Sequence, residues 1–262
     1  MTVQQILDYV NSMAPAHMKA EWDNVGLLCG RREQEVHKIL VALDPFPAVC
    51  REAAAVGADL IVTHHPLIFR APKTITTDDT VGESILFLAS HGISAINAHT
   101  NLDCAPGGVN DVLARTLGLE QVRVLNPEGE DPQGRPWGLL RAGTVAEMAL
   151  EDFMTLVKAR LHTPVLRYAD GGRPVGRVAV GGGSCADGLP EVLAAGCDTF
   201  VTADVKYNQF WDAHDLGLNL IDAGHFYTEN PVCAVLAAGL QTQFPQIEVV
   251  LSKDHADCMK FF

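Results

Sequence analysis

Apolar residues recur with two different periods along the first hundred residues. Near the start they are spaced three to four positions apart, which predicts an amphipathic helix over residues 3–13. Short unbroken apolar runs follow, and the expected strands are residues 25–30, 39–43, 60–62 and 93–97. Residues 47–56 and 81–91 lie between these runs and are helical by composition. Strands and helices that alternate at short intervals indicate an α/β fold with substantial parallel pairing.

The same alternation continues in the second half of the chain. We expect strands at 137–142, near 166, near 178, at 199–202, at 218–221 and near 249–251, and helices at 110–117, 150–161 and 231–240. A further helix should begin at Gly181-Gly182-Gly183-Ser184 and run to Ala195. We predict a two-domain α/β protomer with mixed, partly parallel sheets flanked by helices.

The stretch 126–136 is polar and rich in proline and glycine, which indicates a loop and a candidate domain boundary. We expect residues 1–125 with 216–262 to form one discontinuous domain that carries the metal-binding residues. Residues 126–215 should form an inserted second α/β domain.

Two adjacent histidines, His64 and His65, end the apolar run 60–62 and precede Pro66. In a continuing strand, neighbouring side chains point to opposite faces and could not reach one metal ion. Pro66 breaks the strand, so both imidazoles can converge on the edge where α/β folds place their sites. The structural alternative is one core histidine beside an exposed one.

Three more apolar runs end directly in acidic or imidazole side chains. The clusters are His99 to Asp103, Asp204 to Tyr207, and Asp222 to Glu229. Each cluster alone is compatible with a helix cap, a surface turn or a buried structural histidine. Recurrence at strand ends favours metal binding or catalysis. We expect Glu229 at the start of a helix, with His225 in the loop before it.

Composition narrows the classes of protein. The net charge of −13 argues against nonspecific binding to nucleic acid. The seven cysteines form no Cys-x-x-Cys pair, which is typical of reduced thiols in a cytoplasmic protein. The N-terminus does not resemble a signal peptide, and no apolar run approaches the ~20 residues of a membrane span.

Five ordered motifs then identify a family. They are Trp22-Asp23-Asn24-Val25-Gly26-Leu27, Thr63-His64-His65-Pro66-Leu67, His99-Thr100-Asn101-Leu102-Asp103, Asp204-Val205-Lys206-Tyr207 and Gly224-His225-Phe226-Tyr227-Thr228-Glu229. Together they resemble the NIF-three-like family, often labelled GTP cyclohydrolase I type 2 homologues. The resemblance implies two divalent metal ions in each chain and a ring-shaped homohexamer.

The resemblance also implies site residues. The metal ligands it implies are His64, His65, Asp103, His225 and Glu229, with Glu229 bridging the two ions. His99 would lie beside them and bind water or substrate, while Asp204 and Lys206 are further catalytic candidates. Mixed nitrogen and oxygen ligands suit zinc, iron, manganese, cobalt or nickel. Asn208 stands where the family usually has histidine, and its amide cannot act as an acid or base near neutral pH.

A metal pair suits hydrolysis, so we predict a metal-dependent hydrolase that acts on a nucleotide-like small molecule. The alternatives are a metal-binding or chaperone protein without turnover and a scaffold for a partner.

For the glycine-rich segment 181–184 a tight turn is favoured over a phosphate cradle. Trp22 is interpreted as core or rim packing rather than a stacking platform, and Asp23 and Asn24 could orient ligands. His255 is interpreted as structural or solvent-facing, and a contact of Lys253-Asp254-His255 with the site is the alternative.

Overall fold

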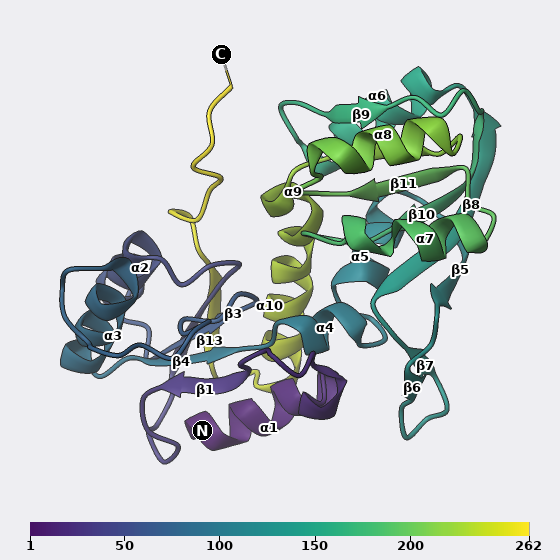
Figure 1. Cartoon of the computed structure of the whole chain (residues 1–262). Coiled ribbons are helices and arrows are strands. Elements are labelled where there is room, and N and C mark those ends of the chain that lie inside the picture. The colour runs from purple at the N-terminus through teal and green to yellow at the C-terminus, as the bar shows by residue number, and fades with distance from the viewer. Residues whose placement is uncertain (262) are drawn as a thin grey trace. The chain divides into compact units, whose positions relative to one another are not determined.

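The computed structural model describes residues 1–261. They form two compact units, and each is described by itself. Unit 1 comprises Met1–Leu102 and Cys233–Asp257, whereas unit 2 comprises Asp103–Val232 and the residues from Cys258 on. The chain therefore leaves unit 1 after Leu102, returns to it through α10 and leaves it again after Asp257 (Figure 1). Within residues 1–261, no helix has the length and apolar character required to cross a membrane.

Unit 1 is built around a five-stranded sheet with the order β1-β4-β3-β2-β13. Its strands are β1 (Gly26–Cys29), β2 (Lys38–Ala42), β3 (Leu60–Thr63), β4 (Ser94–Asn97) and β13 (Glu248–Leu251). Strands β4, β3, β2 and β13 are parallel neighbours, and β1 is antiparallel to β4. Four adjacent strands thus end at the same edge of the sheet.

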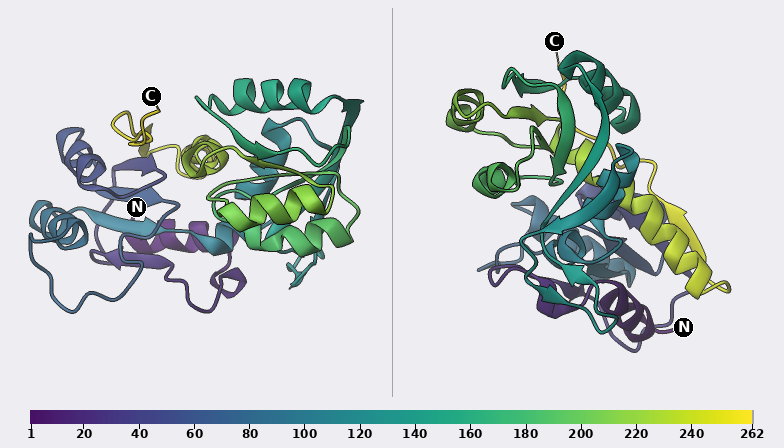
Figure 2. Two further views of the ribbon diagram at one scale, coloured as in Figure 1. Left: turned by 45° about the horizontal axis from the view of Figure 1, so that its top comes forward. Right: turned by 90° about the vertical axis from the view of Figure 1, so that its right-hand side faces the viewer.

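Helices cover both faces of this sheet. They are α1 (Val3–Met13), the short 3-10 helix η1 (Ala16–Met18), α2 (Pro47–Ala55), α3 (Thr80–His91) and α10 (Pro231–Gln243), and α4 (Thr100–Cys104) follows β4. Helices α2 and α3 lie side by side on one face, and α1 and α10 lie on the other (Figures 1 and 2). Both faces are covered, so the central strands are buried along their whole length.

Local sequence explains where these helices begin and end. Thr2 and Gln5 form a capping box at the start of α1, in which each side chain accepts a hydrogen bond from the other residue's backbone. Asp79 caps the start of α3. Gly92 ends α3 in the left-handed conformation, with φ of 66°.

Unit 2 contains a six-stranded sheet with the order β5-β8-β10-β11-β12-β9. Its strands are β5 (Glu120–Leu125), β8 (Leu140–Met148), β9 (Arg167–Ala169), β10 (Val175–Val180), β11 (Thr199–Thr202) and β12 (Asn219–Asp222). Its helices are α5 (Val109–Thr116), α6 (Leu150–Leu161), η2 (Ala186–Gly188), α7 (Leu189–Ala194), α8 (Tyr207–Asp215) and α9 (His225–Glu229). One apolar core joins the sheet to α5 and α6, and a second joins it to α7 and α8. Only β10, β11 and β12 are parallel.

The predicted α/β class with mixed sheets is confirmed, but three details differ. The expected boundaries at residues 125 and 216 are not those of the units, because β5 pairs with β8 and β12 pairs with β11 inside unit 2. The stretch 126–136 lies inside unit 2 rather than at a domain boundary, and β6 (Gly129–Glu130) and β7 (Pro136–Trp137) pair there as a hairpin closed by Asp131. After the glycines at 181–183, helical structure begins only at Ala186.

Candidate functional site

In unit 1 the carboxyl ends of β3 and β4 bring three histidines together. Strand β3 ends at Thr63, so His64 and His65 lie in the turn that follows, and His99 lies just beyond β4. One ligand atom of each imidazole lies within 4.8 Å of the other two. The backbone break after Thr63 therefore lets adjacent side chains share one region, as the sequence predicted.

Each of these imidazoles is held through its Nδ1 atom. Nδ1 lies 2.9 Å from the carbonyl oxygen of Ala98 for His64, 2.6 Å from Asp44 Oδ1 for His65, and 2.8 Å from Asp23 Oδ1 for His99. An oxygen acceptor at Nδ1 places the ring hydrogen there and leaves the Nε2 lone pair for a metal ion.

Asp23 links the first sequence motif to His99. Burial acts to raise the pKa of this carboxyl, but hydrogen bonds from His99 and Thr100 outweigh it and hold the pKa well below its usual range. The Thr100 hydroxyl lies 2.5 Å from Asp23 Oδ2. The neighbouring Asn24 donates to the carbonyl oxygen of Ile68. Asp23 thus orients His99, in the role the sequence suggested for it.

The structure resolves the open alternatives for two further residues of unit 1. The indole of Trp22 is exposed, and its ring lies 5.6 Å from Phe69 and 6.2 Å from His99 between centroids. His255, which we expected to be structural or solvent-facing, directs a buried ring at Asp44 with Nε2 3.0 Å from Oδ2. The sequence signal for this position of His255 is the predicted strand before it. That strand, β13, ends at the same edge of the sheet as β2, β3 and β4.

In unit 2 the ends of β11 and β12 carry the second group of candidate residues. His225 is the first residue of α9 and Glu229 is the last, so their side chains share one helix face. This corrects the expectation of a loop histidine followed by a new helix at Glu229. The Nε2 atom of His225 lies 3.0 Å from Glu229 Oε2, and its Nδ1 atom lies 2.7 Å from Asp204 Oδ2.

Two carboxylates surround the His225 ring. Burial acts to lower the pKa of His225, but Asp204 and Glu229 outweigh it and raise that pKa to about 11. The hydrogen bond from His225 in turn lowers the pKa of Asp204. A divalent ion bound at Nε2 would displace the proton there and supply the positive charge that the two carboxylates favour.

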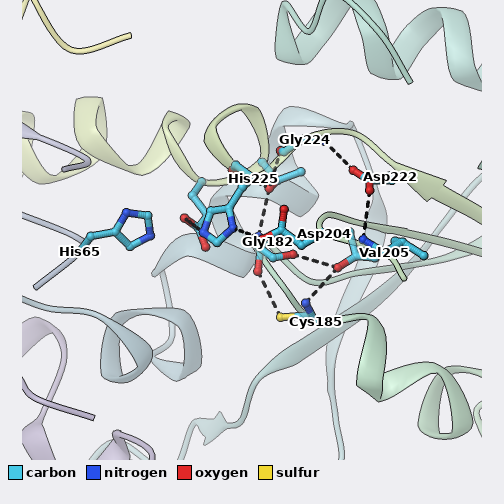
Figure 3. Close-up of polar contacts among 12 residues, drawn as sticks. His65, Gly182, Cys185, Asp204, Val205, Asp222, Gly224 and His225 are labelled. Carbon is cyan, nitrogen blue, oxygen red and sulfur yellow. Dashed lines mark hydrogen bonds and ion pairs between the residues drawn. The ribbon is translucent and has the colours of Figure 1, made fainter. Parts of the chain in front are cut away.

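Asp222, at the end of β12, orders the loops around His225. Its carboxylate accepts hydrogen bonds from the backbone amides of Val205 and Gly224 and from the Arg167 guanidinium. Figure 3 shows the first two of these bonds, with Asp204 beside the His225 ring. The turn residues on both sides are thereby fixed to one carboxylate, and sequence analysis assigned no separate role to Asp222.

The glycine-rich segment lies against Glu229 and does not cradle a phosphate. The amides of Gly181, Gly182 and Gly183 donate to Val201 O, Asn110 Oδ1 and Thr228 Oγ1, respectively, so these N–H groups are already used. A Cβ atom on Gly183 would lie 2.1 Å from Glu229 Oε1, and φ at this glycine is +65°. Glycine is required here because the backbone approaches the carboxylate closely.

Asp103 is buried in α4, and the chain beyond it is held by a buried arginine. The Arg141 guanidinium donates to the carbonyl oxygens of Cys104 and Ala105 and pairs with Asp111 at 2.5 Å. Asn110 also donates to the Asp103 carbonyl oxygen, at 3.2 Å. These contacts fix the backbone of the candidate ligand, and sequence reasoning missed Arg141 because its partners are distant in the chain.

The remaining candidates around Asp204 are exposed. Lys206 Nζ lies 3.6 Å from Asp187, and both side chains are mostly in solvent. Tyr207 and Asn208 are exposed in the first turn of α8. The geometry therefore gives Asp204 a defined partner in His225 and leaves Lys206 in a solvated ion pair.

Comparison with known proteins identifies the family of the chain. The family model described as Duf34/NIF3 (NGG1p interacting factor 3) matches residues 1–257. A Clostridium perfringens protein named GTP cyclohydrolase 1 type 2 homolog is 35% identical and is covered over 100% of both chains. A Streptomyces coelicolor protein of the same name is 37% identical over 91% of this chain and 85% of its own.

Solved structures give the same result at the level of the fold. A Bacillus cereus protein related to NIF3 superposes with a TM-score of 0.93 at 26% identity, over 100% of this chain and 99% of its own. The Staphylococcus aureus protein SA1388 superposes with a TM-score of 0.91 at 28% identity, over the same shares. With a family model that spans nearly the whole sequence and relatives of this similarity, the chain belongs to the Duf34/NIF3 family.

Proposed function

We propose that this protein is a divalent-metal-dependent hydrolase that acts on a nucleotide-like small molecule. One observation supports the metal most directly: in both units the candidate imidazoles use Nδ1 for an oxygen acceptor. His64, His65 and His99 do so in unit 1, and His225 does so in unit 2. This orientation is common for metal-binding histidines, because the second hydrogen bond fixes the ring and its tautomer.

The donor set fits a pair of hard-to-borderline divalent ions. Unit 1 would supply the imidazoles of His64 and His65, and unit 2 would supply His225, Asp103 and Glu229. That the two groups serve one dinuclear centre is part of the proposal and comes from the family resemblance. Bound divalent ions supply Lewis acidity for hydrolysis.

The other candidate residues take supporting roles in this proposal. His99 offers Nε2 to water or to a substrate oxygen, because Asp23 occupies its Nδ1. Asp204 orients His225 and so acts as a positioning residue. Lys206 is retained only as a solvated cation that a phosphate group could attract.

An exposed aromatic pair supports a planar ring in the substrate. Trp22 and Phe69 lie beside His99, and large parts of both rings face solvent. A heteroaromatic base gains about 1–3 kcal/mol by stacking on such a side chain. The relatives' printed name, GTP cyclohydrolase 1 type 2 homolog, points toward the same class of small molecule.

The test is a substrate screen with metal-reconstituted protein. Metal-free protein is loaded separately with zinc, manganese, iron, cobalt or nickel and assayed against nucleotides and phosphoesters. We expect turnover that Asp103→Ala abolishes and that Glu248→Ala, a change on the exposed edge of β13, leaves intact. Metal binding without turnover of any class would instead favour the metal-binding or chaperone function.

A double-mutant experiment tests whether the two groups of ligands serve one centre. His65→Ala and Glu229→Ala should each remove bound metal and activity, and the double variant should lose no more than either single variant. Independent losses would mean separate sites.

We also propose a homohexamer in the cytoplasm, and sedimentation of a monomer at micromolar concentration would contradict the hexamer.

A further inference from the structure

The carboxylate of Asp44 lies between two imidazoles of unit 1. Its Oδ1 atom is 2.6 Å from Nδ1 of His65, and its Oδ2 atom is 3.0 Å from Nε2 of His255. The exposed fractions are 18% for His65, 16% for Asp44 and 6% for His255, so solvent competes little for these bonds. Each oxygen accepts from a different ring, and the carboxylate cannot rotate without losing a hydrogen bond.

Sheet topology accounts for this arrangement. Strands β3, β2 and β13 are adjacent and parallel, so their carboxyl ends lie in that order along one edge. His65 follows β3, Asp44 follows β2 and His255 follows β13. The order of the three side chains therefore repeats the order of the strands, and residues about two hundred positions apart become neighbours.

The tautomer of His255 is set by the backbone. The amide of Leu43 donates to His255 Nδ1 at 3.4 Å, so the ring hydrogen resides on Nε2 and points at Asp44. Burial acts to raise the pKa of the Asp44 carboxyl, whereas the hydrogen bonds from His255 and His65 act to lower it. The hydrogen bonds outweigh burial and hold this pKa well below its usual range. Asp44 therefore accepts from both rings and fixes the hydrogen of His65 on Nδ1.

The turn that carries His255 is itself anchored. Ser252 donates its amide to Val41 O at 2.9 Å, and its hydroxyl accepts from the His255 amide at 3.1 Å. Glu52 in α2 accepts from the Ser252 hydroxyl and from the amides of Lys253 and Asp254. The imidazole of His255 is thus held by the fold from several directions before it contacts Asp44.

We propose that His255 is a positioning residue for His65. Through Asp44 it keeps the His65 ring in one orientation, with the ring hydrogen on Nδ1, so that a divalent cation would bind at Nε2. The role toward a metal rests on the proposed function, whereas the effect on the His65 ring does not require a metal.

Three variants separate this role from a general contribution to folding. His255→Phe keeps a ring of similar size but removes the donor, and His255→Gln restores an amide donor to Asp44. Ser252→Ala is the matched control, because it loosens the same turn and keeps the imidazole. Affinity for Co²⁺ and Zn²⁺ is measured by competition with a chromogenic chelator, and the tautomer of His65 is read in metal-free protein from ¹⁵N chemical shifts of the ring.

We expect His255→Phe to weaken metal binding about tenfold, at the low end of the 10–100-fold effects of outer-sphere partners. It should also add the second tautomer to the His65 spectrum. His255→Gln and Ser252→Ala should stay within about threefold of the wild type, below that loss. In an Asp44→Ala background, His255→Phe should have no further effect on either measurement.

Two results would overturn the inference. One is an unchanged His65 tautomer with unchanged metal affinity in His255→Phe. The other is a loss that persists in the Asp44→Ala background or that Ser252→Ala reproduces, because the effect would then come from the turn. Wild-type protein that binds neither metal would contradict the proposed function, and the tautomer measurement would still decide the role of His255.

Discussion

Single hydrogen bonds decide which atom each candidate ligand presents. The Nδ1 atoms of His64 and His65 lie against Ala98 O and Asp44, and that of His225 lies against Asp204. In unit 2 the position of Glu229 depends further on a backbone that comes close to its carboxylate, at Gly183. Residues that touch no metal therefore determine the geometry of those that would.

Gly183→Ala tests this dependence. The new methyl group would lie 2.1 Å from Glu229 Oε1, and we expect the flexible carboxylate to move away. The stability loss should stay near ~1–2 kcal/mol, the cost of a left-handed alanine, while metal affinity falls more than about tenfold. Chemical denaturation and chelator competition measure the two effects.

Gly172→Ala provides the matched control for that variant. Its φ is +72°, close to that of Gly183, but no atom lies within 4 Å of the added Cβ. It should lose a similar amount of stability and keep full metal affinity. Equal metal affinity in the two variants would show that the close approach of Gly183 does not matter.

Trp22→Ala tests the stacking surface. We expect the dissociation constant of a nucleotide to rise by about tenfold, since stacking on an aromatic ring is worth about 1–3 kcal/mol, while metal content stays unchanged. Trp211→Ala, an exposed tryptophan on α8, should have no effect. Isothermal titration calorimetry with the nucleotide measures both, and equal affinities in wild type and Trp22→Ala would contradict a stacking role.

The sequence was sufficient to select the candidate ligands but not their supporting partners. His64, His65 and His225 follow apolar runs, and that pattern is local. The acceptors of their ring hydrogens depend on which strands pair, which is not encoded locally. For the same reason the burial of His255 and the exposure of Trp22 could not be decided from the sequence, because both follow from tertiary packing.

Helix α4 and its surroundings illustrate how an element is fixed in place. It is only five residues long, too short to be stable by itself. The buried guanidinium of Arg141 binds the carbonyl oxygens of Cys104 and Ala105 at its end and pairs with Asp111 in α5. The stability of this region should therefore depend on a single charged side chain.

Arg141→Met should destabilise unit 2 by about 3 kcal/mol, because it leaves the Asp111 carboxylate and several buried carbonyl groups without their donor. Arg141→Met with Asp111→Leu should recover part of that loss. Arg135→Ala is the control, since Arg135 is exposed, and it should change stability by less than about 1 kcal/mol. Urea denaturation measures all three, and an Arg141→Met protein as stable as the control would contradict this account.

Predictions from the sequence agreed best with the structure for helices that have a clear apolar periodicity. Helix α1 was expected at residues 3–13 and α6 at 150–161, and both begin and end there. Sequence analysis missed the hairpin of β6 and β7 and the helix α9. The hairpin lies in a proline-rich segment, and α9 has only five residues, so neither element shows a clear apolar period. Unit boundaries depend on sheet pairing, so they could not be inferred from composition.

At the scale of the whole molecule, the free thiols predict sensitivity to alkaline pH. Burial raises the pKa of the Cys50 thiol to about 11 and also raises the pKa values of Cys29 and Cys197. The unfolded chain ionises these groups near its ordinary thiol pKa of ~8.5, while the folded chain keeps them protonated. Stability is therefore complete below that pH and falls as the pH rises toward the folded-state values.

We expect the free energy of unfolding to decrease between pH 8 and 10 by up to about 1.4 kcal/mol per pH unit for each such thiol. Urea denaturation in the presence of a reductant measures this slope. Cys50→Ala should reduce the slope, and Cys258→Ser, at an exposed thiol, should not. A Cys50→Ala protein with the wild-type slope would contradict the assignment.

The most direct test of the metal-binding account is a crystal of metal-loaded protein measured at the absorption edge of the bound ion. The account predicts anomalous peaks about 2.0–2.2 Å from Nε2 of His64, His65 or His225, the usual metal–nitrogen distance. It also predicts that the Nδ1 contacts to Ala98, Asp44 and Asp204 persist. Loaded protein with no peak at these nitrogen atoms, or with the ion bound at Nδ1, would contradict it.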